Sequence, residues 1–215
     1  MLKVVKFGGS SLASAEQFKK VADIIHADES RRYVVPSAPG KRFKEDTKVT
    51  DMLYDCYGVA SKGYDFADLF ADIKARYQEI IDELGLDLSL EKEFANIEAA
   101  FRARAGRDYA ASRGEYLNGI ILANYLGYEF VDAEEVIFFD TNGNLDSKKT
   151  NQVLSERLLT VDRAVVPGFY GIRPNDTIKT FSRGGSDITG SIVARAVKAD
   201  LYENWTDVSG FLHVA

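Results

Sequence analysis

The apolar residues of the chain follow two spacings, one typical of buried strands and one typical of amphipathic helices. Short β-branched runs that stop at glycine or proline predict strands at 2–7 and 33–35. After the first run, Ser14 and Gln17 form a capping pattern that predicts the start of a helix, and another helix is expected at about 49–57. This β, α, β order predicts an α/β fold, in which helices cover a parallel sheet.

The middle of the chain departs from this alternation. Apolar residues at helical spacing run from Phe66 to Leu84, stop at Gly85, and resume from Leu90 to Phe101. These repeats predict two amphipathic helices, which form a helical hairpin inserted at about 64–106. We interpret their acidic outer faces as solvated surface.

The remaining elements follow from the same patterns. With no linker or internal repeat visible in the sequence, we expect one domain over residues 1–215. The predicted helices are 116–126, 151–159 and a helix after 187, the predicted strands are 128–131, 136–139, 164–166 and 177–181, and a turn is expected at 142–144.

Composition narrows the class of protein. Of 215 residues, 46% are apolar, so the chain can bury a sizeable core and is not a disordered sequence. The 27 Lys and Arg and 33 Asp and Glu give a net charge of −6 without a basic block, so we expect neither nucleic acid nor a membrane as a partner. A single cysteine, Cys56, indicates a reducing, cytoplasmic setting and is expected to be a small core residue.

Two glycine-rich segments carry the candidate chemistry. Lys6-Phe7-Gly8-Gly9-Ser10 puts a cation at a strand end, followed by positions where bare backbone N–H groups can approach a phosphate. Arg183-Gly184-Gly185-Ser186-Asp187 joins a bidentate donor and a carboxylate at the entry to a helix. The alternatives are a purely structural turn for the first segment and, for the second, a surface loop in which Arg183 and Asp187 pair with each other.

Extended to Ser11 and to Ser182–Gly190, these two segments stand in order with four others: Ser37-Ala38-Pro39-Gly40, Lys48-Val49-Thr50-Asp51, Arg113-Gly114-Glu115 and Trp205-Thr206-Asp207-Val208-Ser209-Gly210. In this set the chain resembles the aspartokinases of the amino-acid kinase family over nearly its whole length. The resemblance implies a three-layer αβα sandwich with a mainly parallel sheet. It also implies ATP-dependent phosphorylation of the L-aspartate side-chain carboxylate to 4-phospho-L-aspartate, the first step toward lysine, threonine and methionine.

The resemblance also implies roles for single residues in handling ATP. Lys6 would neutralise phosphate oxygens during catalysis, and Asp187 would orient Lys6. Mg²⁺ would bridge the phosphates, with metal ligands that the sequence leaves unassigned. The ATP-binding residues implied are Lys6, Gly8, Gly9, Ser10, Thr206 and Asp207.

For L-aspartate, the resemblance implies contacts from Ser37, Thr50, Glu115 and Arg183. The Arg183 guanidinium suits the α-carboxylate and Glu115 suits the α-ammonium. Without the resemblance, Glu115 reads as an exposed carboxylate near a helix N-terminus. Trp205 is interpreted as a packed aromatic side chain rather than as a stacking partner for adenine.

Two other functions stay open on the sequence. The chain could phosphorylate another substrate, such as glutamate, N-acetylglutamate or a nucleotide, or it could be a non-catalytic domain that binds a nucleotide or an amino acid. Aspartokinases continue past the position of Ala215 into further nucleotide-contacting sequence and regulatory ACT domains. We therefore expect this chain to be the N-terminal catalytic part, incomplete at its C-terminus, of a longer, homo-oligomeric protein.

Overall fold

A mainly parallel sheet forms the centre of the computed structural model, which describes residues 1–207 and 211–214, with side chains described up to Thr206. The strands lie in the order β3 (Glu129–Phe130), β4 (Ala164–Val165), β2 (Arg31–Pro36), β1 (Lys3–Phe7), β7 (Leu201–Asp207) and β8 (Phe211–Val214). Strand β1 pairs in parallel with β2 on one side and β7 on the other. Strand β8 pairs with β7 in the antiparallel direction.

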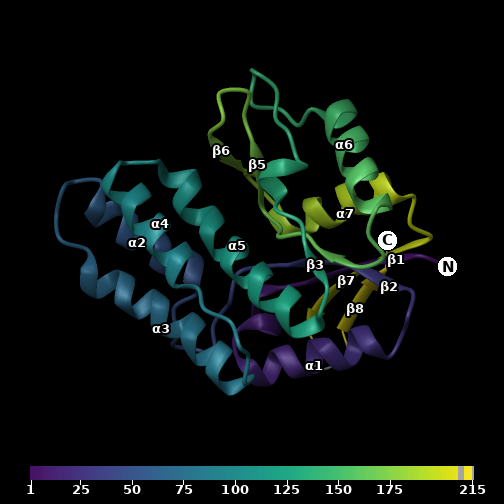
Figure 1. Cartoon of the computed structure of the whole chain (residues 1–215), viewed down its shortest axis with the longest axis horizontal. Helices are drawn as coiled ribbons and strands as arrows, with labels where there is room; N and C mark the ends of the chain where they lie inside the picture. The colour runs from purple at the N-terminus through teal and green to yellow at the C-terminus, as the bar shows by residue number, and fades with distance from the viewer. Residues whose placement is uncertain (208–210, 215) are drawn as a thin grey trace.

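Alternate strand residues divide the interior into two cores because successive side chains of a strand point to opposite faces. Val5 and Val34 face a core covered by α1 (Ala15–His26) and the second half of α5 (Arg107–Leu126). Their neighbours Val4 and Val35 face a second core, to which α6 (Ser147–Leu159) and α7 (Gly185–Val197) contribute. Figure 1 shows these helices on either side of the sheet, which confirms the predicted three-layer αβα sandwich.

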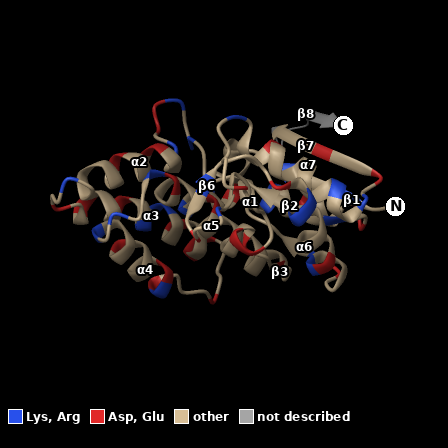
Figure 2. Cartoon of the chain, turned by 90° about the horizontal axis from the view of Figure 1, so that it is seen from above, with Lys and Arg blue, Asp and Glu red and all other residues tan. Residues whose placement is uncertain are grey.

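Helices α2 (Val49–Ala60), α3 (Ala67–Glu83) and α4 (Glu91–Arg102) extend the first core to one side. They pack on the first half of α5 and lie at one end of the molecule, far from the N-terminus (Figure 2). Edge-to-face rings of Phe70 and Phe94, with centroids 6.2 Å apart, join α3 to α4. Both helices of the predicted hairpin are therefore confirmed, and their insertion into a single domain stays a prediction.

Two predicted boundaries are wrong. Helix α5 begins at Arg107, nine residues before the predicted start at Tyr116. Residues 110–115 are all buried, so the sequence before Tyr116 shows no amphipathic period that would predict the helix. The segment 136–139 is not a regular strand: it forms isolated bridges, from Phe138 to Ile172 of the next hairpin and from Phe139 to Leu145, while the N–H of Phe138 donates to Thr150 Oγ1 at 2.9 Å.

A small hairpin also lies outside the main sheet. Strand β5 (Tyr170–Ile172) pairs with β6 (Ile178–Thr180), and only the second of them falls in a segment predicted as a strand. The hairpin is tied to the start of α5, where Asp108 accepts hydrogen bonds from Thr180 N at 3.3 Å and Thr180 Oγ1 at 3.1 Å. Tyr170 and Ile178 of the hairpin are buried in the second core. Figure 1 shows the hairpin projecting from the sheet on the side of α6 and α7.

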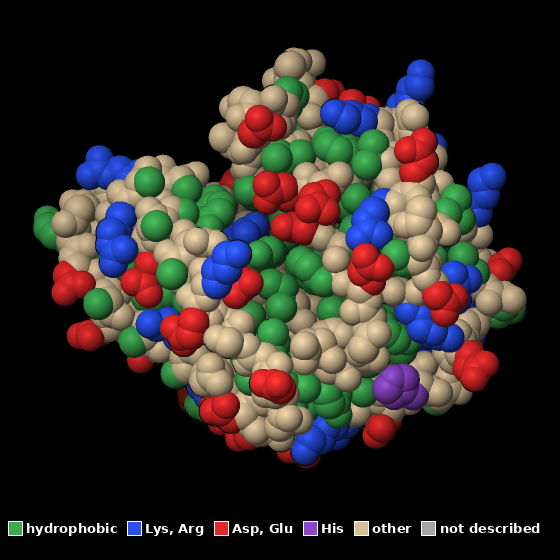
Figure 3. Space-filling view, in the orientation of Figure 1, with side chains coloured by type: hydrophobic (Ala, Val, Ile, Leu, Met, Phe, Trp, Pro, Cys, Tyr) green, Lys and Arg blue, Asp and Glu red, His purple; other side chains and the backbone are tan. Residues whose placement is uncertain are grey.

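Side chains of both charge signs are mixed on one face of the molecule (Figure 3). On the face shown in Figure 3, Lys and Arg side chains lie among Asp and Glu side chains, with apolar side chains between them. Within the described residues, the helices lack the combination of length and apolar character that crossing a bilayer requires.

Candidate functional site

Lys6 and Asp187 meet at the carboxyl end of the sheet. Lys6 is near the end of β1 and Asp187 is in the first turn of α7, and Lys6 Nζ lies 2.6 Å from Asp187 Oδ1. Lys6 is buried, at 8% exposure, whereas 51% of the Asp187 side chain is exposed. Asp187 thus pairs with Lys6 rather than with Arg183, and the pair opens to solvent on its acidic side.

A turn of bare backbone adjoins the lysine. After β1, the N–H of Gly8 donates to Trp205 O at 3.2 Å, and the chain continues as the short 3₁₀ helix η1 (Gly9–Leu12). Gly40 of a second loop donates to Gly9 O at 2.8 Å, and a Cβ on Gly40 would lie 2.6 Å from the carbonyl carbon of Gly9. Because only glycine allows such an approach, the two loops form a compact backbone surface beside Lys6.

A cavity of about 320 Å³ opens at this point. Three elements bring its polar groups together: the loop after β2 carries Ser37, the first turn of α2 carries Thr50, and α5 carries Glu115. Ser37 is held from both sides, since its N–H donates to Phe7 O at 3.1 Å and its carbonyl accepts from Asn118 Nδ2 at 2.8 Å. The lining residues are Lys6, Ser37, Lys48, Thr50, Glu115, Phe169, Gly184, Gly185, Ser186 and Asp187.

Glu115 is a buried carboxyl group, only 5% exposed, so the alternative of an exposed helix-end carboxylate is wrong. Burial raises its pKa to about 8, although the backbone amides of Glu115 and Ala38 and the charge of Arg113 act in the opposite direction. Its Oε1 has no hydrogen-bond partner among the described residues. A cation that entered the cavity would therefore favour the ionised form of Glu115, and the resulting carboxylate would accept a hydrogen bond from the cation.

Two other predicted residues, Arg183 and Thr206, are not among those that line this cavity. Arg183 is exposed and does not line it, whereas the next three residues, 184–186, do. Thr206 is exposed on β7, directly after Trp205, whose carbonyl holds Gly8. The side chain of Asp207 and residues 208–210 lie outside the described part of the chain.

Trp205 packs against the sheet. Its ring stacks on Phe7 with centroids 6.1 Å apart and an interplanar angle of 22°, and the Arg31 guanidinium lies 5.4 Å from the ring. The interpretation of Trp205 as a packed aromatic side chain is therefore confirmed.

Five residues of the cavity are not predicted as site residues from the sequence: Lys48, Phe169, Gly184, Gly185 and Ser186. All but Phe169 belong to segments that carry other candidates, so their position in these motifs is the signal that could have indicated them. Phe169 has a φ of +87° and its ring packs against Gly185 at the start of α7. It follows the end of the strand at 164–165, the edge where ligands bind in open α/β sheets.

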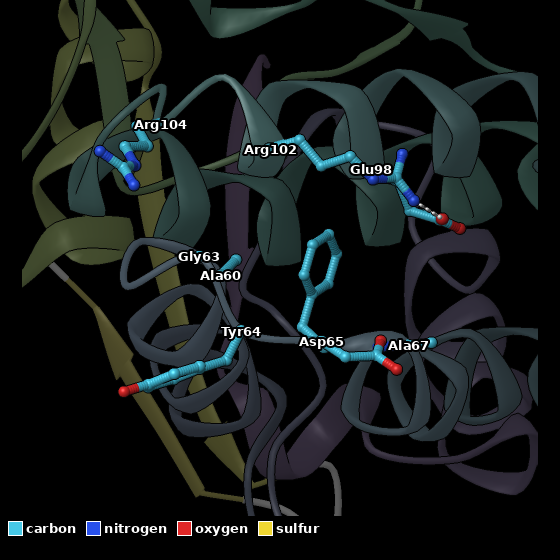
Figure 4. A pocket seen from close by; sticks show the side chains of 9 residues that line it. Ala60, Gly63, Tyr64, Asp65, Ala67, Glu98, Arg102 and Arg104 are labelled. Carbon is cyan, nitrogen blue, oxygen red and sulfur yellow. Dashed lines mark hydrogen bonds and ion pairs between the residues drawn. The ribbon is translucent and has the colours of Figure 1, made fainter.

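A second hollow, of about 400 Å³, lies away from the predicted residues. Figure 4 shows it between the loop that joins α2 to α3 and the end of α4, where Arg102 pairs with Glu98 at 3.4 Å. In the part of the chain that the structure describes, no group of three or more His, Cys, Asp or Glu side chains is arranged to hold a metal ion.

The parallel sheet with a lysine and a glycine turn at its carboxyl edge defines a class of protein. The family model described as the amino acid kinase family matches residues 1–213, and the chain belongs to this family. Among its relatives, aspartokinase 3 of Bacillus subtilis is 40% identical over 227 residues, which cover 99% of this chain and 50% of the relative. Aspartokinase 1 of Arabidopsis thaliana, chloroplastic, is 32% identical over 97% of this chain and 40% of its own length.

Solved structures agree with this assignment. The crystal structure of Clostridium acetobutylicum aspartate kinase matches with a TM-score of 0.94 and 54% identity, covering 98% of this chain and 48% of that one. Escherichia coli aspartokinase III, crystallised with aspartate and ADP, shares the fold with a TM-score of 0.82 at 23% identity, over 96% of this chain and 49% of that one. The chain thus spans half or less of the length of these proteins.

Proposed function

We propose that this chain is the substrate-binding and phosphoryl-transfer part of an aspartokinase, which transfers the γ-phosphoryl group of ATP to the side-chain carboxylate of L-aspartate. One observation carries the proposal: a single cavity joins the Lys6–Asp187 ion pair to the buried Glu115 carboxyl group. Kinship with aspartokinases of bacteria and plants supports it.

The chemistry of the transfer explains why such a site needs charge rather than a base. The aspartate side chain is already ionised at neutral pH, so its oxygen can attack the γ-phosphorus without losing a proton. A bond forms between the carboxylate oxygen and the γ-phosphorus as the bond from the γ-phosphorus to the oxygen of the β-phosphate breaks, and ADP leaves. The obstacle is the repulsion between two anions, which Lys6 and the N–H groups of Gly9 and Ser10 would offset.

ATP would enter as a complex with Mg²⁺, which would supply positive charge against the phosphates and needs few protein ligands. Asp187 would keep the Lys6 ammonium aimed at the transferred group through the 2.6 Å ion pair. Thr206 and Asp207, at the end of the neighbouring strand, would contact the nucleotide.

The amino acid would be held at its other end. Glu115 would bind the α-ammonium, Ser37 and Thr50 would contribute hydroxyl groups, and Arg183, exposed beside the cavity, would bind the α-carboxylate. The buried acceptor Glu115 favours a substrate with a free amino group and disfavours an N-acetylated one.

Two further expectations belong with this proposal. The buried, free Cys56 supports a reducing, cytoplasmic setting. The homo-oligomeric state expected for the longer protein stays a prediction.

Trapping the acyl phosphate with hydroxylamine tests the proposal. The protein is incubated with Mg²⁺-ATP and, in turn, aspartate, glutamate and N-acetylglutamate, and the hydroxamates are measured. We expect a hydroxamate with aspartate alone. Phosphorylation of glutamate instead would assign another amino-acid substrate, and tight binding of ATP and aspartate without any hydroxamate would indicate a non-catalytic binding domain.

A further inference from the structure

Arg76 on α3 is a buried cation outside the cavity. It is only 5% exposed, although it lies on a helix whose outer face is charged. Its Nη1 donates to Thr47 O and its Nη2 to Gly40 O, both at 2.8 Å. Nη1 also lies 3.6 Å from Asp46 Oδ2. Because burial of an unpaired guanidinium is costly, these three partners account for its place in the interior.

The three partners belong to one loop, residues 40–48, which joins β2 to α2. The loop closes on itself, since Val49 N donates to Pro39 O at 3.0 Å. Inside it, Asp46 accepts three hydrogen bonds from Arg42, at 2.9 Å from the backbone N, 2.7 Å from Nε and 3.0 Å from Nη2. Two side chains of α3 contact this loop. Glu79 pairs with Arg42 on the exposed side, at 3.5 Å, whereas Arg76 is buried and binds a backbone carbonyl near each end of the loop.

The two ends of the loop lead directly to the site. At the first end, the peptide groups of Gly40 are held on both sides: its carbonyl accepts from Arg76 and its N–H donates to Gly9 O at 2.8 Å. At the second end, Thr47 precedes Lys48 and Thr50, which line the cavity. A change at Arg76 therefore reaches the glycine turn and the cavity wall together.

We propose that Arg76 is a positioning residue for the phosphate-binding turn and the amino-acid cavity. Its guanidinium fixes loop 40–48, which in turn sets Gly9 on one side and Thr50 on the other. This inference rests on the proposed function for its kinetic consequence, whereas its structural content is independent of the reaction. It also gives helix α3 a role in the site beyond that of solvated surface.

The fold of α3 does not depend on this guanidinium. The apolar face of the helix, with Phe70, Ile73 and Tyr77, is fully buried in the first core. Loss of the guanidinium would leave that face intact and would free the carbonyls of Gly40 and Thr47. The expected effect is therefore a loosened loop on a folded protein.

Hydrogen exchange measured by mass spectrometry tests whether Arg76 holds loop 40–48, without any assay of activity. In Arg76→Met, amides in peptides that cover 40–49 are expected to exchange about tenfold faster, while peptides from α5 and the sheet keep their rates. Arg76→Lys, which retains one charged donor, is expected to give an intermediate rate. Lys74→Met is the matched control, because Lys74 is a cation on the same helix whose ion pair is with Glu98 on α4, at 3.6 Å, and not with the loop.

Kinetics then measure the consequence for the site. Arg76→Met is expected to raise the KM values for aspartate and ATP and to lower kcat, up to about 100-fold in kcat/KM, with partial recovery in Arg76→Lys. Lys74→Met is expected to match the parent protein. If the parent protein phosphorylates no amino acid, the proposed function fails. Hydrogen exchange alone then decides whether Arg76 holds loop 40–48.

Two results would overturn the inference. One is unchanged exchange over 40–49 in folded Arg76→Met. The other result applies if Arg76→Met does not fold, in which case Arg76→Lys is the variant that decides. If Arg76→Lys then has the exchange rates and kinetics of the parent protein, the paired hydrogen bonds of the guanidinium do not position the loop.

Discussion

The ammonium group of Lys6 and the carboxylate of Asp187 lie 2.6 Å apart although they come from opposite ends of the chain. The pair is asymmetric: the cation is buried beneath Gly8, and the carboxylate is half exposed. A half-exposed ion pair contributes only about 0–1 kcal/mol to stability. The ion pair therefore contributes mainly by orienting the Lys6 ammonium group, not by stabilising the fold.

Asp187→Asn keeps the shape of this pair and removes its charge. We expect kcat for aspartate phosphorylation to fall about 10²- to 10³-fold, because a donor aimed at developing charge loses its orientation, while the melting temperature changes little. Lys6→Met is expected to lower kcat at least as much, and the double variant to be no worse than Lys6→Met, since the two residues act as a unit.

The other end of β1 supplies the control for this prediction. Lys3 forms an ion pair with Asp28, also at 2.6 Å, away from the cavity. Asp28→Asn is expected to leave kcat unchanged. Normal turnover in Asp187→Asn, measured beside this control, would remove the Lys6–Asp187 pair from the mechanism.

Glu115 should make aspartate binding depend on pH. Its pKa of about 8 means that the carboxyl group is mostly protonated at neutral pH in the free protein, whereas an α-ammonium favours the ionised form. The affinity for aspartate should therefore rise about tenfold per pH unit up to about pH 8 and then level off. Calorimetry in buffers of different ionisation enthalpy should detect close to one proton released per aspartate at pH 7 and far fewer at pH 9.

Glu115→Gln separates binding from folding. It should raise KM for aspartate more than KM for ATP and abolish the pH dependence of binding, and equal changes in both KM values would point to a folding defect. Because the folded-state pKa is raised from 4.5, the stabilising contribution of Glu115 is present below pH 4.5 and is lost as the pH rises through 8. The variant should therefore unfold like the parent protein below pH 4.5 and be more stable by up to about 5 kcal/mol above pH 8.

The sequence predicts the regular parts of this fold because burial gives them a readable apolar pattern. Helices α1, α3 and α4 have one exposed and one buried face, and Ser14 caps α1 by accepting from Gln17 N at 3.4 Å, as its capping pattern predicts. Strands β1 and β2 are buried on both faces, so they appear as short continuous β-branched runs. Residues 110–115 of α5 are all buried, and α2, α3, α4 and β6 pack on this helix, so the pattern there has no period and does not reveal where the helix begins.

The site is less accessible to sequence reasoning because it depends on contacts between distant elements. Nothing local indicates that Asp187 faces Lys6, because the pairing follows from the position of α7 across β1 and β2. Arg76 is a still harder case. An arginine in an amphipathic helix normally lies in solvent, and only the packing of α3 against loop 40–48 shows that this one is buried.

Gly40 should tolerate no side chain. A Cβ at this position would lie 2.6 Å from Gly9 C and 2.8 Å from Ser10 N, both of them backbone atoms. Gly40→Ala is expected to lower the free energy of unfolding by about 1–3 kcal/mol and to raise KM for ATP, because the glycine turn must move. Gly58 is the control: it lies inside α2, where an added Cβ would have nothing within 4 Å, so Gly58→Ala should leave KM unchanged and stabilise by about 0.5–1 kcal/mol. Equal kinetics in the two variants would contradict a functional role for the contact between the loops.

The pair of Arg31 and Glu203 should be a main support of the sheet. Glu203 on β7 is only 3% exposed and binds Arg31 on β2 through Nε at 2.7 Å and Nη2 at 3.2 Å, across the central strand β1. Glu203→Ala leaves the Arg31 charge without its partner in the interior and is expected to cost about 3–5 kcal/mol in urea unfolding. Glu129→Ala removes a comparable contact, 2.8 Å from Arg157, but at the exposed edge strand β3, where the expected cost is about 0–1 kcal/mol. Similar losses in the two variants would mean that burial adds nothing to this pair, and that the order β2, β1, β7 is maintained by backbone hydrogen bonds and apolar packing alone.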